Sequence, residues 1–260
     1  NSRRKIMTIK KIVLSCLIIF IFFFLINSIW AQENNALTDI SNANELYHDK
    51  DYIAAAKIFK NLIAEGHVNG YLYFNLGNTH MRLGEIGPAI LNYLLAKSLL
   101  PRNESIEANL KYAINKTVDR LDPPRTGFIQ ELFFWVQAAS LNEYFQLSIL
   151  LNIFFWTVSI GYLCLRTPTW KTLKTVSMTA LLFVFISTGI KYHLQSSQKL
   201  GVIIDKKIAV KSDTGIQNIT LFELNEGAII KINEGNGTWV NISLDADKTG
   251  WVPIKSIGYY

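Results

Sequence analysis

The stretch "FNLGNTHMRLGEIGPAILNY", Phe74 to Tyr93, decides the fold of the N-terminal half of the chain. It contains a Leu-Gly pair that ends at Gly77, a second Leu-Gly pair that ends at Gly84, and an Ala-x-x-x-Tyr sequence that closes it. Apolar residues recur at helical spacing on both sides of Gly84, and glycine is common just after the end of a helix. The stretch therefore predicts two helices with a turn between them at Gly84.

The helical pattern repeats with a period of about thirty-four residues. When Gly70–Asn103 is placed over the residues before it, Ala89 and Tyr93 align with Ala55 and Phe59. Period and pattern resemble the tetratricopeptide repeat, whose other marked positions are occupied here by Tyr73, Leu76, Gly77, Ala96 and Pro101. The match is weaker over residues 36–69, where Asn42-Ala43 replaces Leu-Gly.

The residue types at these positions have mechanical reasons. We expect Gly77 and Ala89 to be small because the two helices touch there, while Tyr93 fills the space between helices. Pro101 ends the second helix because proline cannot continue the hydrogen-bond ladder. Residues 104–121 have apolar side chains at helical spacing, which predicts a helix that caps the stack. The sequence thus predicts an all-α tetratricopeptide solenoid over residues 34–120.

One face of the first helix of the clear repeat is a candidate partner-binding groove. Its residues that do not face the second helix are Tyr71, Phe74, Asn78 and Met81. In a solenoid such residues line a concave binding surface. The alternative is that Phe74 and Met81 only pack on the adjacent repeat, and the pattern leaves both interpretations open.

The N-terminal segment, residues 1–33, has the features of an export signal. Its run from Ile12 to Trp30 has no charge and follows several basic residues, which is typical of a secretory signal peptide. The run also exceeds the usual apolar length of a signal, so either cleavage or retention as an anchor is possible. Cys16 precedes most of the run, so a buried membrane cysteine is preferred over a lipoprotein cleavage site.

Two further apolar runs, Tyr144 to Leu165 and Val176 to Ile190, predict a transmembrane hairpin over residues 143–194. The loop between them has no acidic residue and three basic ones, Arg166, Lys171 and Lys174. The positive-inside rule then places this loop in the cytoplasm and the segments on either side of the hairpin outside it. Residues 121–142 combine a Pro-Pro linker with an aromatic stretch that suits an interfacial helix.

From residue 200 to residue 260 the pattern changes to short alternating strands. Asn236-Gly237 is a hairpin signal, and the segment is long enough only for a small β-barrel. The order of "AVKSDTG", "LNEGAIIKI", "GTWVNI" and "GWVPIKSI" resembles bacterial SH3-type domains. Trp239 and Trp251 are candidates for an aromatic ligand cleft. The alternative is that one of them, Trp239 in preference to Trp251, belongs to the barrel core.

The sequence contains no motif that predicts catalysis. The four histidines are isolated, and no metalloprotease, nucleophile-elbow, Walker or dinucleotide-binding motif occurs. His80 occupies a position typical of a packing residue. The two cysteines lie in apolar runs, and the net charge of +6 is concentrated in the leader and beside membrane runs. We therefore expect no enzyme, no cofactor, no metal site and no nucleic-acid partner.

The order of these parts resembles the BatE family of bacterial aerotolerance operons. The most specific shared run is "FNLGNTHMRLGEIGPAILNYLLAKSLLPRNESIEANLKYA", although Glu107 stands near a position where that family often has arginine. The resemblance implies an inner-membrane scaffold that works with von Willebrand A-domain membrane proteins, a BatD-like protein and, indirectly, a MoxR-type ATPase. It implies protein partners rather than a chemical activity.

Taken together, the sequence predicts a multidomain membrane protein with a tetratricopeptide solenoid, two transmembrane helices and a C-terminal SH3-like barrel. The expected function is that of a non-enzymatic adaptor in the bacterial inner membrane, with both folded domains on the periplasmic side. The alternative function is a peptidoglycan-binding envelope anchor that acts through the SH3-type domain.

Overall fold

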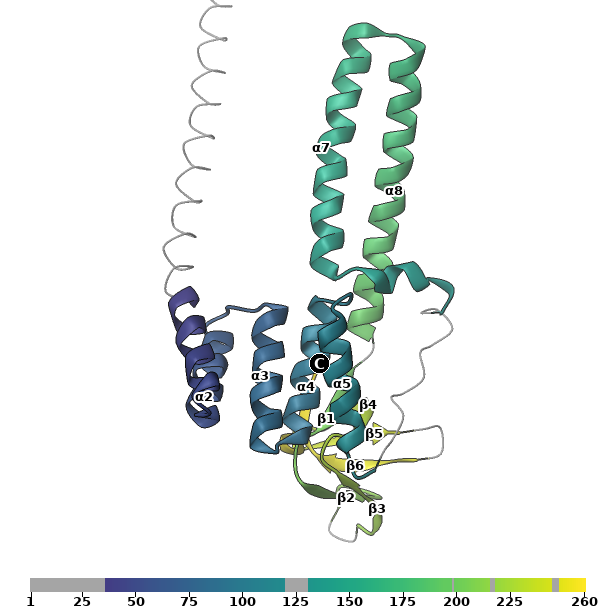
Figure 1. Ribbon diagram of the computed structural model, residues 1–260. Coiled ribbons are helices and arrows are strands. Elements are labelled where there is room, and N and C mark those ends of the chain that lie inside the picture. Colours follow the sequence, from purple (N-terminus) through teal and green to yellow (C-terminus); the bar gives the residue numbers. More distant parts are fainter. Residues whose placement is uncertain (1–35, 120–130, 198, 216–217, 245–247) are drawn as a thin grey trace, which may run out of the picture. The chain divides into compact units, whose positions relative to one another are not determined.

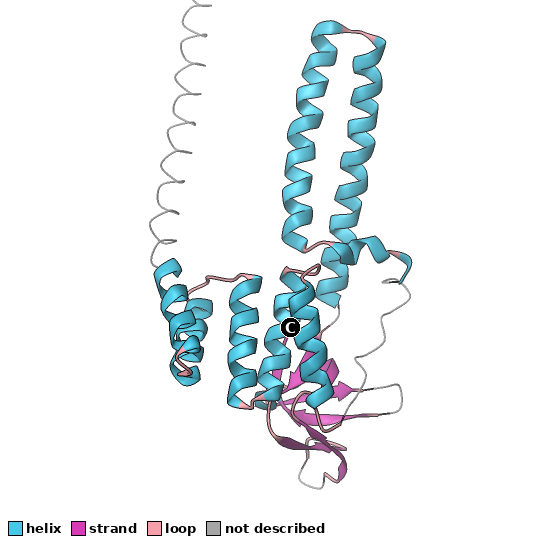
Figure 2. Cartoon of the chain, viewed as in Figure 1, coloured by secondary structure: helices cyan, strands magenta, loops and turns pink. Residues whose placement is uncertain are grey.

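The structure of the chain is a computed structural model, and it describes residues 36–119, 131–197, 199–215, 218–244 and 248–260 (Figure 1). The expected leader, residues 1–33, and the Pro-Pro linker lie outside the described residues. The chain divides into two compact units, residues 1–67 and residues 68–260. Within the described residues the layout is helical first and β-sheet last (Figure 2). The predicted multidomain combination of helices and β-structure is confirmed at this level.

The first unit contains a pair of helices. One covers residues 36–48, and the second, α2, covers Tyr52–Ala64. Lys50 turns the chain between them with a positive φ of 68°. Asp51 begins α2 as its N-cap, where its side chain accepts a hydrogen bond from the backbone N–H of Ala54 at 3.1 Å. Its position directly after a turn is typical of a carboxylate that caps a helix.

Three helices open the second unit: α3 (Gly70–Leu83), α4 (Ile86–Leu99) and α5 (Glu104–Lys116). Asn69 caps the start of α3, and Gly84 ends it in the left-handed conformation with φ of 75°. α4 ends two residues before Pro101, as that proline predicts. A Cβ atom placed on Gly77 would lie 2.7 Å from the Tyr93 ring and 3.3 Å from the carbonyl oxygen of Ala89. The predicted close approach at Gly77 and Ala89 is therefore present.

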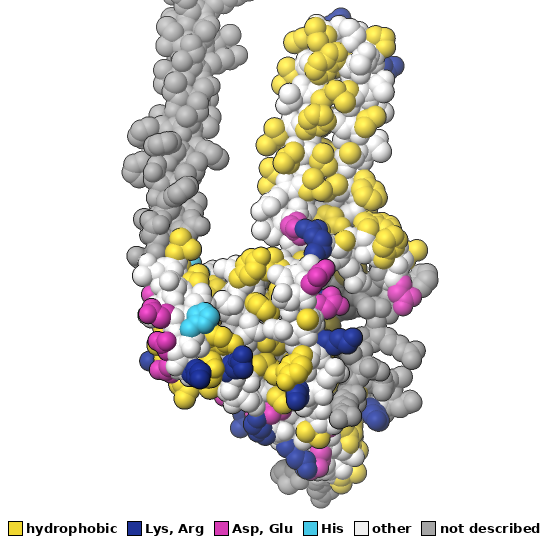
Figure 3. Space-filling view, in the orientation of Figure 1, with side chains coloured by type: hydrophobic (Ala, Val, Ile, Leu, Met, Phe, Trp, Pro, Cys, Tyr) yellow, Lys and Arg dark blue, Asp and Glu magenta, His cyan; other side chains and the backbone are white. Residues whose placement is uncertain are grey.

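A long helical hairpin follows a short 3₁₀ helix, η1 (Phe134–Ala138). Its helices are α7 (Leu141–Leu165) and α8 (Pro168–Ser197), and both are long and apolar enough to cross a membrane. Small polar residues lie between them, where the hydroxyls of Ser148 and Thr188 are 3.2 Å apart. Apolar side chains cover the outer surface of the hairpin (Figure 3). This distribution supports the predicted association with a membrane.

The segment before the hairpin is anchored to α8. The indole N–H of Trp135 in η1 donates to the hydroxyl of Ser187 at 3.3 Å, and its ring stacks on Phe183 with centroids 6.0 Å apart. The Tyr144 hydroxyl donates to the backbone carbonyl of Trp135 at 3.0 Å. Among the described residues of this stretch, Glu131 and Leu132 are helical, and Phe134–Ala138 form the 3₁₀ helix η1.

The C-terminal region forms one seven-stranded antiparallel sheet in the order β3-β2-β6-β5-β4-β1-β7. The strands are β1 (Leu200–Ile203), β2 (Lys207–Lys211), β3 (Thr220–Asn225), β4 (Ile229–Gly235), β5 (Trp239–Ser243), β6 (Thr249–Pro253) and β7 (Ile257–Tyr259). Alternate side chains meet in one apolar core that includes Ile230, Ile242 and Val252. The predicted Asn236-Gly237 hairpin joins β4 to β5, with φ of 93° at Gly237.

The sheet packs on α4 through an apolar contact. Val202 of β1 and Ile229 of β4 belong to the same buried cluster as Ile90 and Tyr93 of α4. Gly87 is the point of closest approach, because a Cβ there would lie 2.5 Å from the carbonyl oxygen of Ile203. No periodic pattern in the sequence indicates this packing of the sheet on α4.

Candidate partner-binding surfaces

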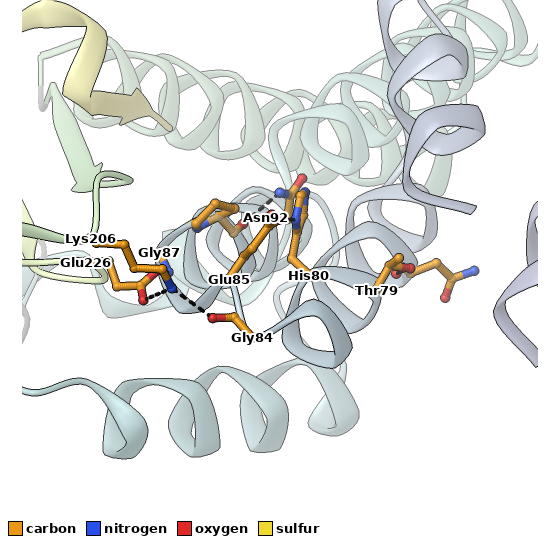
Figure 4. A network of polar contacts seen from close by, with 10 residues as sticks. Thr79, His80, Gly84, Glu85, Gly87, Asn92, Lys206 and Glu226 are labelled. Carbon is orange, nitrogen blue, oxygen red and sulfur yellow. Dashed lines mark hydrogen bonds and ion pairs between the residues drawn. The ribbon is translucent and has the colours of Figure 1, made fainter. Parts of the chain in front are cut away.

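Polar contacts fix the sheet to the turn between α3 and α4. The Lys206 ammonium lies 2.5 Å from the Glu226 carboxylate and donates to the carbonyl oxygen of Gly84 at 3.1 Å (Figure 4). The second oxygen of Glu226 accepts from the backbone N–H of Gly87 at 3.3 Å. The Glu226 side chain is only 12% exposed, and its carboxylate satisfies a first-turn N–H of α4 that has no partner within the helix.

A second polar contact joins the sheet to the residues after α5. The Asp119 carboxylate accepts from both the backbone N–H and the side-chain amide of Asn225, each at 2.7 Å. Paired hydrogen bonds to an ionised group are stronger than neutral ones and fix orientation. The sheet is therefore held at two places, the turn before α4 and the residues after α5.

Three of the four predicted groove residues face into the helix stack. The Asn78 side-chain oxygen accepts from the Tyr93 hydroxyl and from the Asn109 amide, both at 2.8 Å. The Phe74 ring lies 6.0 Å from that of Tyr93, and both Phe74 and Met81 pack on the cluster around Tyr93. The structure therefore favours the packing interpretation of Phe74 and Met81, although each is only partly buried.

Tyr71, the fourth predicted residue, is different, because it is 61% exposed. On α5, Tyr112 is 57% exposed, and the Lys116 ammonium lies 5.4 Å from the centre of its ring. The amide pair of Asn78 and Asn109 joins α3 to α5. We call the surface that carries the exposed Tyr71 of α3 and Tyr112 of α5, together with the partly buried amide pair that joins the two helices, the α3–α5 face.

For the helix that carries Asn109 and Tyr112, the sequence pattern predicts only a capping role. Neither residue is therefore a binding candidate from the sequence. The signal that could have found them is the period itself. One repeat length after Asn75 and Asn78 the chain has Asn109 and Tyr112, on a helix that begins one repeat length after α3. A capping helix can therefore contribute side chains at the same positions as the helix that it covers.

The two tryptophans lie on the outer side of the sheet. In the register of β5 and β6, Trp239 is opposite Pro253 and Trp251 is opposite Asn241, while Val240 and Val252 between them point into the core. Both tryptophans are half-buried. Trp239 is not among the buried residues of the core, whereas its neighbour Val240 is, so the structure favours the outward position over the core alternative.

Amide groups lie beside these tryptophans. The Asn233 amide donates to the side-chain oxygen of Asn241 at 2.8 Å, and the Ser243 hydroxyl contacts Asn233 at 3.4 Å. We call Trp239, Trp251, Asn241 and Asn233 the tryptophan face. It combines flat apolar rings with hydrogen-bonding groups, which is the chemistry of a surface that can hold a polar ring or an extended chain.

His80 is part of the helix packing. It is almost completely buried, and its Nδ1 lies 2.5 Å from a carboxylate oxygen of Glu85 at the start of α4. No group of three or more metal-binding side chains occurs among the residues that the structure describes. His80 thus has a structural position, as its place in the sequence pattern predicts.

No model of a known protein family matches the chain, and no curated protein matches it. The contacts described above are therefore the basis on which a function is proposed.

Proposed function

We propose that this protein is a non-enzymatic adaptor of the bacterial inner membrane that binds a partner protein on the α3–α5 face. In this proposal α3 and α4 form a tetratricopeptide hairpin, α5 continues the stack, and the C-terminal sheet is an SH3-type barrel. The resemblance to the BatE family implies von Willebrand A-domain membrane proteins and a BatD-like protein as partners, with a MoxR-type ATPase acting indirectly.

The observation that carries the proposal is the arrangement around α4. The β-sheet covers α4 and is hydrogen-bonded to the turn before α4 and to the residues after α5. The α3–α5 face carries two largely exposed tyrosines, one on each helix, and an amide pair joins the two helices. Tyrosine supplies a large contact area at low entropic cost, and amides bind an extended backbone.

The orientation in the membrane is part of the proposal. Arg166, Lys171 and Lys174 follow α7 or lie in the first turns of α8, so the positive-inside rule places this end of the hairpin in the cytoplasm. The α3–α5 face would then act in the periplasm, where the proposed partners have domains.

A pull-down from detergent extract tests the adaptor function. Wild-type protein should recover von Willebrand A-domain proteins, identified by mass spectrometry, and Tyr71→Ala with Tyr112→Ala should reduce their recovery about tenfold, since two interface aromatics often contribute more than 1 kcal/mol each. Tyr259→Ala, a change of an exposed tyrosine on β7, is the control. Equal recovery by the double variant and the control would remove the α3–α5 face from the proposal.

Asn78→Ala is a poor test of binding, although the sequence pattern favours it. Asn78 accepts two hydrogen bonds inside the stack, so its loss lowers stability as well as any affinity. Alanine variants of the exposed Tyr71 and Tyr112 separate an effect on affinity from one on stability, because truncation of an exposed side chain usually changes stability by about 0.5 kcal/mol or less.

The second candidate function, a peptidoglycan-binding anchor, is favoured by the tryptophan face. The two outward tryptophan rings can stack on sugar rings, and the amides beside them can form hydrogen bonds with the sugar hydroxyls. Full-length protein in detergent should then sediment with purified cell-wall sacculi, and Trp239→Ala with Trp251→Ala should abolish it. The full chain is required because Val202 and Ile229 are buried against α4. Sedimentation that does not change in the double variant would exclude this surface.

A further inference from the structure

A cavity lies where the membrane hairpin meets the folded domains of the second unit. Its volume is about 350 Å³, which falls in the range of small-ligand pockets. Its walls come from four places: Leu94 and Lys97 of α4, Val136 of η1, Lys191 and Leu194 of α8, and Tyr260 at the end of the described chain. The cavity exists only because the sheet, α4 and the hairpin meet.

The wall chemistry combines apolar surface with positive charge. Most of the lining is apolar, and the two charged side chains in it are both lysines. No acidic side chain is among the described residues that line the cavity. An apolar interior with cationic groups matches an anionic amphiphile, since a free phosphate would leave the apolar walls uncovered and a neutral chain would leave the lysines without a counter-charge.

The lysines differ in the partners that they already have. Lys97 lies 3.6 Å from Glu107 in a solvent-exposed pair, which is a weak interaction. Lys191 has no hydrogen bond or ion pair with any residue in the described part of the chain, and it is only half-exposed. Glu143 acts on Lys191 electrostatically, but its carboxylate is held by Arg102 and by the backbone N–H of Ser140. The half-buried ammonium of Lys191 can therefore take an external anion.

The location of the cavity identifies the source of that anion. Lys191 and Leu194 lie on one side of the last turns of α8, a helix long and apolar enough to cross a membrane. Val136 follows Trp135, which bonds to Ser187 on α8. These elements lie at one end of the hairpin. In a membrane-crossing hairpin this end is at the interface, where lysine side chains contact lipid headgroups.

We propose that this cavity holds an acyl chain of one anionic phospholipid, with Lys191 and Lys97 facing its phosphate. Such a lipid would fill the space between the hairpin and the folded domains and fix their contact. The inference does not depend on the adaptor function, because it concerns the lipid at the base of the domain and not the α3–α5 face.

Photo-crosslinking with the full-length protein in nanodiscs tests the proposal. The probe is phosphatidylglycerol with a diazirine on one acyl chain, and the comparison is phosphatidylcholine with the same chain. The anionic probe should label peptides that contain Leu94, Val136 or Leu194 about tenfold more than the neutral probe, because the two lysines attract a headgroup with net negative charge more strongly than a neutral one. This measurement on the wild type needs no variant.

Charge variants identify the headgroup contact. Lys97→Gln with Lys191→Gln should lower labelling of the cavity by the anionic probe to the level of the neutral probe. Lys171→Gln, at the opposite end of α8, should leave it unchanged. Labelling confined to the outer surfaces of α7 and α8, or equal labelling of the cavity by both probes, would overturn the proposal. A loss of partner recovery with normal lipid labelling would count only against the adaptor function.

Discussion

Gly77 shows how one residue sets the distance between two helices. The Tyr93 ring occupies the space where any side chain on Gly77 would lie, and the carbonyl oxygen of Ala89 is just behind it. The sequence predicts this contact from the residue types alone, because a repeat with small residues at matching places in both helices has few other ways to pack.

We expect Gly77→Ala to lower the free energy of unfolding by about 1–3 kcal/mol, because the added methyl group must displace the Tyr93 ring in a packed interior. Gly189→Ala is a matched control, since a Cβ at that helical glycine meets nothing within 4 Å. Thermal unfolding in detergent measures both. Equal effects of the two changes would mean that α3 and α4 do not touch at Gly77.

The stability of the fold at high pH depends on the ionisation of the Tyr260 hydroxyl. Burial raises the pKa of its hydroxyl to about 12, while an unfolded tyrosine titrates near 10. The neutral form is therefore favoured in the folded state, and its contribution to stability is complete below about pH 10 and is lost as the pH rises toward about 12.

The wild type should thus lose stability between about pH 10 and pH 12 by up to about 2 kcal/mol more than Tyr260→Phe, which has no hydroxyl to ionise. Chemical denaturation at a series of pH values measures this difference. Tyr112→Phe, on the exposed part of α5, should keep the wild-type profile. Parallel profiles for wild type and Tyr260→Phe would show that Tyr260 does not carry this effect.

At the scale of elements, α4 is the centre of the second unit. It contacts α3 and α5 on one side and the β-sheet on the other. The hydrophobic pattern of α4 reflects this, because Ala89 and Leu91 both pack in the apolar cluster although they lie on opposite sides of the helix. A helix that is apolar on several sides predicts several neighbours, but it does not identify them.

Gly87→Ala should separate α4 from the sheet. Its methyl group would meet the carbonyl oxygen of Ile203, which also accepts a hydrogen bond from the backbone N–H of Gly227 at 2.8 Å. Because backbone atoms cannot rotate away, we expect a loss of about 1–3 kcal/mol and faster amide exchange at Gly227. Gly215→Ala, in an exposed loop with ordinary contact distances, is the control. Unchanged exchange at Gly227 would contradict the packing of α4 on β1.

At the scale of the whole second unit, the hairpin places both folded parts at one end of the membrane helices. α7 begins and α8 ends at that end, where Arg102 binds Glu143 and donates to the carbonyl oxygen of Ala138 at 3.0 Å. The order of the chain then requires residues 68–119 and 200–260 to lie on the same side of a membrane that the hairpin crosses.

Cysteine labelling tests this arrangement in a background of Cys16→Ser and Cys164→Ser. In spheroplasts, an impermeant maleimide should label Ser105→Cys and Ser212→Cys, while Thr167→Cys, in the loop between α7 and α8, should react only after lysis. Different accessibility of residues 105 and 212 would contradict the hairpin. If only residue 167 is labelled in spheroplasts, the hairpin has the opposite orientation to the one proposed, although the fold itself is not contradicted.

Local patterns in the sequence are enough to predict the helices and strands. The helical period with Gly77, Gly84 and Pro101 gives the bounds of α3 and α4, the apolar runs give α7 and α8, and alternation with Asn236-Gly237 gives the β4–β5 hairpin. Each of these signals is local, because backbone conformation depends on neighbouring residues and on which face must be buried.

Only the tertiary structure decided how these elements meet. The contacts of Gly87 with Ile203 and of Asp119 with Asn225 join residues that are far apart in the chain, and the cavity brings Lys97 of α4 and Lys191 of α8 into one lining. The inward position of Asn78 likewise depends on Asn109 of another helix. Such contacts depend on the complementary shapes and hydrogen-bonding groups of two surfaces, and a periodic pattern along one segment shows which face is apolar but not what covers it.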